Sequence, residues 1–174
     1  YLDAAFTQMR ASDFAGLEAA LKAVTDAHKD DELHTLALTV TADIEALSKA
    51  AEDAKAQHWD GAARDNAGLI ASAQGFAPLA DQAKALVKTI DHLFKLATRV
   101  HEAEVAAGEK PAEGKKRLLA LDAARHEVTE HLKRARYFHG QADWLQTRFP
   151  DAELRDAAPV IDATSPDAYP HPPE

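Results

Sequence analysis

The chain has 174 residues and a formal net charge of −9; 46% of its residues are hydrophobic and 28% are charged. This composition is typical of a single-domain globular or coiled-coil protein. The acidic balance argues against a general nucleic-acid-binding surface, because duplex affinity depends on cations that neutralise phosphates. With no cysteine, no apolar run near the roughly 20 residues of a membrane span and no signal-peptide pattern, we expect a cytoplasmic protein.

Alanine dominates the apolar content, with 39 residues, about a fifth of the chain. Alanine favours helix but buries little side-chain surface, so the composition predicts long helices packed closely around a thin core. Residues 1–11 are expected to form a helix end, and the start at Tyr1 within an apolar-periodic segment indicates a piece of a longer protein. Ser12 or Asp13 can cap a second helix. Its apolar residues recur at steps of three and four: Phe14, Leu17, Leu21 and Val24.

A third helix is predicted over 32–58, after the HKDD stretch at 28–31, where Asp30 or Asp31 is placed to cap it. Its apolar residues repeat every seven positions over nearly four heptads, as in a coiled coil, so this seam must face a partner helix. One row is Leu33, Val40, Leu47 and Ala54, and the other is Leu36 or Ala37, Ile44, Ala51 and His58.

The helical pattern resumes after WDG at 59–61, and Gly75 and Pro78 predict a break or kink in it. Beyond that point the chain has its best heptad pattern. One row is Leu79, Leu86, Leu93 and Val100, the other is Ala83, Ile90, Ala97 and Glu104, and Val87 and Phe94 widen the stripe.

GEKPAEG at 108–114 has the glycines, proline and charges of a turn between helices. The last long helix is predicted over about 115–148 and is ended by Phe149-Pro150. Its rows are Leu121, Val128, Ala135, Ala142 and Phe149, with Leu118, Leu132, Phe138 and Leu145 beside them. We therefore expect an all-α fold of long antiparallel helices that form a bundle or coiled-coil hairpins.

Two parts of the chain differ in composition. Residues 1–149 are predicted to form the helical bundle, whereas residues 150–174 contain six of the eight prolines and carry a charge of −5. The second part cannot supply a core, so we expect a proline-rich, acidic and irregular tail.

Enzymatic chemistry has no recognisable signature. Cysteine is absent, the serines have no nucleophile-elbow glycines around them, and neither GxGxxG nor GxxxxGK[ST] occurs. We expect no catalytic residues and no cofactor.

Nine histidines invite a metal hypothesis. Glu127 with His131, and His126 with Glu130, lie four residues apart, as many ligand pairs do. The two pairs point in different directions and no matching pairs occur on other helices, so solvated charge pairs are the favoured interpretation. His92 and His101 are nine apart, which does not repeat a helical face. A stand-alone helical bundle that binds a metal or small ligand through histidines remains the alternative function.

Two basic groups on the last helix form a candidate basic face for a phosphate backbone or an acidic partner. They are Lys115, Lys116 and Arg117, and Lys133, Arg134 and Arg136. Residues 109–136 carry a local charge of +3 on this acidic chain. A solvated face, or pairing with the acidic tail, is the favoured interpretation.

Aromatic residues gather near the end of the last helix, where 136–156 holds four of the eleven in the chain. Phe138 lies near the core stripe. Tyr137 and Trp144 lie seven apart and slightly off that stripe, with Arg148 one turn further on. Aromatic residues with arginine are typical of interface hot spots, while packing on the helix over 79–107 is the other interpretation.

Three segments resemble a known family: YLDAAFTQMRASDFAGLEAALKAV at the start, APLADQAKALVKTIDHLFKLATRV in the middle and RYFHGQADWLQTRFPDAELRD near the end. They look like the helical C-terminal region of the M (modification) subunit of type I restriction-modification systems. The resemblance covers about residues 1–156. Members of that family are S-adenosylmethionine-dependent DNA adenine methyltransferases that assemble with a DNA-reading specificity subunit.

The family's Asn-Pro-Pro-Phe/Tyr motif and glycine-rich cofactor loop do not occur in this sequence, so no catalytic or cofactor residue carries over. The resemblance instead implies a non-catalytic assembly or scaffold module, a fragment or truncated relative of the M subunit. It would dock to a specificity subunit or to another copy of itself and meet DNA only indirectly. On the matching segment it makes Tyr137, Phe138, Trp144 and Arg148 the residues expected to pack or to contact the partner.

Overall fold

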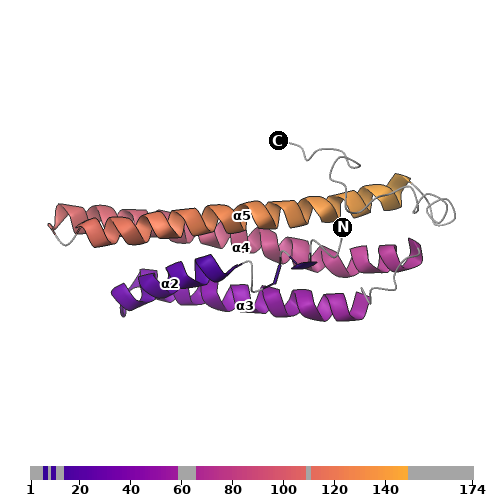
Figure 1. Cartoon of the computed structure of the whole chain (residues 1–174), viewed down its shortest axis with the longest axis horizontal. Coiled ribbons are helices and arrows are strands. Elements are labelled where there is room, and N and C mark those ends of the chain that lie inside the picture. The colour runs from indigo at the N-terminus through magenta and orange to yellow at the C-terminus, as the bar shows by residue number, and fades with distance from the viewer. Residues whose placement is uncertain (1–5, 8, 11–13, 59–65, 109–110, 149–174) are drawn as a thin grey trace.

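The fold is all-α, as predicted (Figure 1). The computed structural model describes the backbone of residues 6–7, 9–10, 14–58, 66–108 and 111–148, and the side chains of all of these except 58, 66–74, 111 and 137–148. This part of the chain contains four long helices, Phe6 and Thr7 are helical as well, and it contains no strand. The four long helices are α2 (Ala15–Ala27), α3 (Glu32–His58), α4 (Asn66–Ala106) and α5 (Pro111–Arg148).

The helices run antiparallel and form a bundle, and they differ in length. α4 packs against α3 and α5, and α2 packs against α3 and α5 in turn. α2 has 13 residues and is therefore about 20 Å long, whereas the 41 residues of α4 span about 60 Å. The bundle consequently has four helices at the end with the α2–α3 and α4–α5 turns, and three long helices at the other end (Figure 1).

The heptad rows of the sequence form the core. Ile44, Leu47, Ile90 and Leu93 are completely buried, and the same rows bury Leu121 and Val128 of α5. The α2 residues predicted to face inward are buried as well: Phe14, Leu17, Leu21 and Val24. Phe138, Ala142, Leu145 and Phe149 lie outside the residues whose side chains are described, so their place in the rows stays a prediction.

The start of α2 differs from the prediction. Its N-cap position is Phe14, which makes no side-chain capping hydrogen bond, rather than Ser12 or Asp13. The Phe14 side chain is buried in the core, and its burial helps to hold the start of this helix in place. Before it, Phe6 and Thr7 are helical, and their carbonyls accept hydrogen bonds from the Met9 and Arg10 N–H groups, each at 3.1 Å. The Phe6 ring meets Phe76 of α4 edge to face, 5.3 Å between centroids.

The sequence predicted a break or kink at Gly75 and Pro78. The break is wrong, because α4 continues through both residues, and the kink stays a prediction. A proline inside a helix removes one backbone hydrogen bond and costs about 3 kcal/mol. Phe76, Leu79 and Ala80 are buried on either side of Pro78, and their packing offsets this local cost. Tertiary burial therefore overrides the local signal.

The two turns follow the sequence signals more closely. The Asp31 carboxylate accepts a hydrogen bond from the His34 N–H at 2.8 Å, so Asp31 is the cap of α3 and that prediction is confirmed. At the end of α4, Gly108 has a φ of +73°, the left-handed conformation that glycine adopts most easily. α5 then begins at Pro111, four residues before the predicted start, because proline suits the first position of a helix.

Candidate functional site

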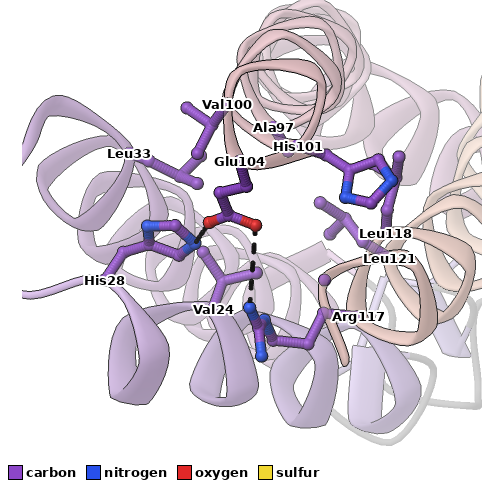
Figure 2. Close-up of a pocket in the computed structure, with 11 residues that line it drawn as sticks. Val24, His28, Leu33, Ala97, Val100, His101, Glu104, Arg117, Leu118 and Leu121 are labelled. Atoms are coloured by element: carbon purple, nitrogen blue, oxygen red, sulfur yellow. Dashed lines mark ion pairs between the residues drawn. The ribbon is translucent and has the colours of Figure 1, made fainter. Parts of the chain in front are cut away.

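A small hollow lies at the four-helix end of the bundle, where the α2–α3 and α4–α5 turns meet (Figure 2). Its floor is apolar and includes Val24, Leu33, Val100 and Leu121, while its polar lining comes from His28, His101, Glu104 and Arg117. The cavity volume is about 20 Å³. That is room for about one water molecule rather than for an organic ligand.

Glu104 is the central polar group of this hollow. It closes the heptad row of Ala83, Ile90 and Ala97 and points inward from α4 (Figure 2). One carboxylate oxygen lies 3.2 Å from His28 Nε2, and the other lies 4.0 Å from Arg117 Nη2. The Glu104 side chain is only 18% exposed. A carboxylate with so little water needs these partners, since burying an unpaired charge is costly.

Gly114 of α5 makes room for this cluster. A Cβ atom at that position would lie 2.7 Å from Glu104 Oε2 and 2.9 Å from His101 Nδ1, closer than real Cβ atoms approach other atoms. The glycine is therefore explained by the close approach of the two side chains to the α5 backbone. His101 Nδ1 is itself buried and makes no hydrogen bond.

The α2–α3 turn holds the other side of the cluster in place. His28 is the C-cap residue of α2, and its N–H donates to the Val24 carbonyl at 2.9 Å. The ring of His34 lies within 2.7 Å of the His28 carbonyl through Nδ1, and within 3.2 Å of the Thr25 carbonyl. Carbonyl oxygens only accept, so His34 carries a proton on Nδ1 and ties the turn to the end of α2.

Arg125 forms a second polar cluster further along the α4–α5 hairpin. Its guanidinium lies 4.0 Å from the centroid of the Phe94 ring and contacts Asp91 at 3.3 Å and Asp122 at 2.7 Å. A guanidinium that stacks on an aromatic ring and pairs with two carboxylates fixes the register of two helices. This cluster joins α4 to α5.

The predicted histidine pairs stay apart. His126 and Glu127 are exposed, and Glu130 contacts Lys133 at 3.7 Å instead of a histidine. His131 is half-buried, with Nδ1 free of hydrogen bonds. Among the described residues, no three His, Asp or Glu side chains are placed to hold a metal ion.

His92 and His101 also separate. His92 is exposed, whereas His101 lines the hollow. The two imidazoles therefore lie apart, which agrees with the prediction that a nine-residue spacing does not repeat a helical face.

The candidate basic face is interrupted. Lys115, Lys116, Lys133 and Arg134 are exposed, and Arg136 is half-buried. Arg117 instead turns toward Glu104 and lines the hollow. Glu127 and Glu130 are exposed between the two basic groups, so the surface of α5 carries mixed charge rather than a continuous cationic stripe.

The aromatic cluster lies at the three-helix end. α5 continues through Tyr137, Phe138, Trp144 and Arg148, but their side chains lie outside the described ones. Whether they pack in the core or contact a partner stays a prediction.

Sequence reasoning missed the cluster of His28, Glu104 and Arg117. The signal was present: Glu104 occupies a position in a heptad row that apolar residues otherwise fill. A carboxylate there needs a buried partner, yet the partners come from the α2–α3 turn and from α5, which no spacing along one helix brings together.

Comparison with known proteins identifies no relative of this chain. No protein-family model matches the chain, and neither a curated protein nor a solved structure is significantly similar to it. Within the part of the chain that the structure describes, no helix combines the length and apolar character of a membrane span.

Proposed function

We propose that this chain is a helical assembly module without catalytic activity of its own, which docks to a protein partner. The resemblance to the C-terminal region of type I restriction-modification M subunits names the first partner to test, a specificity subunit. Self-association through the same helices is the other form of the proposal. The module would contact DNA only indirectly, through the complex.

One observation carries the proposal, the unequal length of the helices. α2 spans about a third of α5 and packs only at the four-helix end. α5 continues into the three-helix end with the sequence Tyr137 to Arg148, which combines aromatic residues with arginine. No other long helix of the described residues takes the place of α2 there. The helical residues Phe6 and Thr7 and the buried Met9 precede α2, and Phe6 packs on Phe76 of α4.

A partner helix fits this arrangement physically. It would lie along α5 where α2 does not reach, in the way that helices of a bundle pack along shared apolar rows. Tyr, Trp and Arg are the residue types that most often dominate binding energy in interfaces. Single exposed apolar residues elsewhere, Leu38, Val105 and Leu119, lie on three different helices, and scattered residues of this kind are ordinary on a protein surface.

The mixed charge of α5 favours a protein over DNA as the direct partner. The exposed Glu127 and Glu130 lie between the two basic groups, and phosphate binding calls for a cationic surface. We therefore expect weak DNA binding by the isolated chain that salt removes.

Size-exclusion chromatography coupled to light scattering tests the proposal on the chain alone and mixed with a specificity subunit encoded beside it. We expect a joint peak with the mass of a complex. In the variant Trp144→Ala the joint peak should weaken while the melting temperature stays nearly unchanged. Lys116→Ala, an exposed residue of the same helix, is the matched control and should leave the complex intact.

Two outcomes contradict the proposal. Separate peaks at all concentrations, with a monomeric chain, would remove the docking role in both forms. A fall of several degrees in melting temperature for Trp144→Ala with unchanged assembly would place Trp144 in the core and not at the interface.

A further inference from the structure

The outer face of α4 carries a stripe of basic residues. They recur at steps of three and four and are all exposed: Lys84, Lys88, His92, Lys95 and Arg99. At 3.6 residues per turn the five positions lie within about 80° of one another around the helix and extend over about 22 Å. They lie opposite the buried Leu86, Ile90 and Leu93, with which α4 packs into the core.

Neighbouring carboxylates do not neutralise this stripe. Between residues 82 and 101 the sequence has one carboxylate, Asp91, which contacts Arg125 of α5 at 3.3 Å. Four cations of the stripe form no ion pair with any described residue: Lys84, Lys88, Lys95 and Arg99. One face of one helix therefore presents four unpaired positive charges.

The charge of this segment is opposite to that of the rest of the chain. Residues 82–101 hold four Lys or Arg and one Asp, a charge of +3, so the other residues together carry −12. A cationic surface on an acidic molecule attracts an anionic partner at one place and repels it elsewhere. The stripe therefore suits a partner whose negative charge is confined to a comparable length.

Exposed carboxylates lie at both ends of the stripe. Asp81 and Glu102 are exposed and fall on the same face of α4 as the cations. A nucleic-acid strand is negative along its whole length, so it would meet these carboxylates and the acidic rest of the chain. An α-helix can instead place Asp or Glu at steps of three and four along a limited stretch of one face, with the same period as the cations of α4. The acidic ends and the spacing favour an acidic helix over a phosphate backbone.

We propose that the outer face of α4 is a docking surface for an acidic α-helix of a protein partner, which forms ion pairs with Lys84, Lys88, Lys95 and Arg99. The inference deepens the proposed function and rests on it in taking the partner to be a protein. It uses a different helix from the aromatic cluster near Trp144. Each exposed ion pair contributes little, so this surface orients a partner more than it sets the affinity, and salt weakens the contact.

Fluorescence anisotropy with two synthetic peptides tests this surface on the full chain at low salt. The one-face peptide is an alanine-rich helix of about 18 residues with glutamates at steps of three and four. The mixed peptide has the same composition, with its glutamates spread around the helix. We expect the one-face peptide to bind about three- to tenfold more tightly, because only this peptide can face all four cations. Equal affinities would overturn the proposal.

Charge reversal shows where the peptide binds. Lys88→Glu combined with Lys95→Glu should weaken binding of the one-face peptide about tenfold, because two attractive contacts become repulsive. The matched control, Lys29→Glu combined with Lys49→Glu, changes the net charge equally at exposed positions outside α4 and should bind nearly as the wild type does. An equal loss in both variants would assign the effect to overall charge and contradict the proposal.

Folding of the variants is checked by circular dichroism. If charge reversal unfolds the chain, Lys88→Gln combined with Lys95→Gln replaces it, and we expect a loss of about threefold. Unchanged binding in that variant would overturn the proposal as well.

Two controls separate this surface from the alternatives. If duplex DNA displaces the labelled one-face peptide more effectively than the unlabelled peptide does, the stripe binds phosphates and the acidic helix is the wrong partner. Trp144→Ala should leave peptide binding unchanged. A missing joint peak with a specificity subunit would then contradict docking near Trp144, while tight binding of the one-face peptide would still support the surface on α4.

Discussion

The middle of the bundle and its four-helix end are held together by different forces. In the middle, α3, α4 and α5 bury complete rows of aliphatic side chains such as Ile44, Leu47 and Ile90. At the four-helix end a few polar side chains, Glu104, His28 and Arg117, meet around a hollow with room for about one water molecule. Burial is non-directional and insensitive to pH, whereas the polar cluster depends on orientation and charge. The middle is therefore held by the burial of aliphatic side chains, and the four-helix end by the placement of a few polar groups.

The largest expected effect comes from the middle. Ile90→Ala removes a completely buried side chain at the centre of the best heptad row, so we expect a loss of about 2–5 kcal/mol in the free energy of unfolding. Urea denaturation followed by circular dichroism measures it.

The matched control is Leu119→Ala on α5, where the leucine is 58% exposed. That change should stay within about 0.5 kcal/mol. Similar losses for the two variants would mean that burial in the aliphatic rows is not the main source of stability. The proposed difference between the middle of the bundle and its four-helix end would then be wrong.

The same contrast explains what the sequence could predict. The rows of α3 and α4 follow from a repeat within each helix, because residues seven apart share one face. The Asp31 cap also followed from a local signal. The break predicted at Pro78 does not occur, because the burial of Phe76 and Leu79 offsets the local cost of a proline inside a helix. The polar cluster could not be predicted.

The reason lies in where its members come from. His28, Glu104, Arg117 and Gly114 belong to a turn and two helices. The packing of α4 onto α5 places Glu104 beside Gly114 and Arg117, and the packing of α2 against α3 and α5 adds His28. No spacing along one helix encodes these contacts. The aromatic cluster near Trp144 is the opposite case, a local pattern whose interpretation stays a prediction.

A smaller effect is expected at the α3 cap. Asp31→Ala removes the acceptor for the His34 N–H and the carboxylate beside His28, so we expect a loss of about 0.5–2 kcal/mol in urea denaturation at pH 7. Asp31→Asn keeps an acceptor for the cap but removes the charge, and asparagine caps as well as aspartate. The asparagine variant should lose less. Equal losses would assign the whole effect to the charge and none to the cap.

The smallest expected effect is the difference in stability between two glycine-to-alanine substitutions, one at an open position and one at a crowded position. Gly16 of α2 is exposed, and a Cβ added there meets nothing within 4 Å. Gly16→Ala should therefore stabilise the chain by about 0.5–1 kcal/mol through helix propensity. Gly114→Ala has the same propensity gain, but its Cβ must displace the Glu104 carboxylate and the His101 ring.

We expect Gly114→Ala to be neutral or destabilising, and to weaken the contact between Glu104 and His28 as well. Thermal unfolding of the two variants side by side gives the difference, which should be about 1 kcal/mol. Because Glu104 ends in a flexible side chain, an equal gain in both variants would show that its carboxylate moves aside freely. The four-helix end would then be loosely packed, and its polar contacts would not constrain the helices as the aliphatic rows of the middle do.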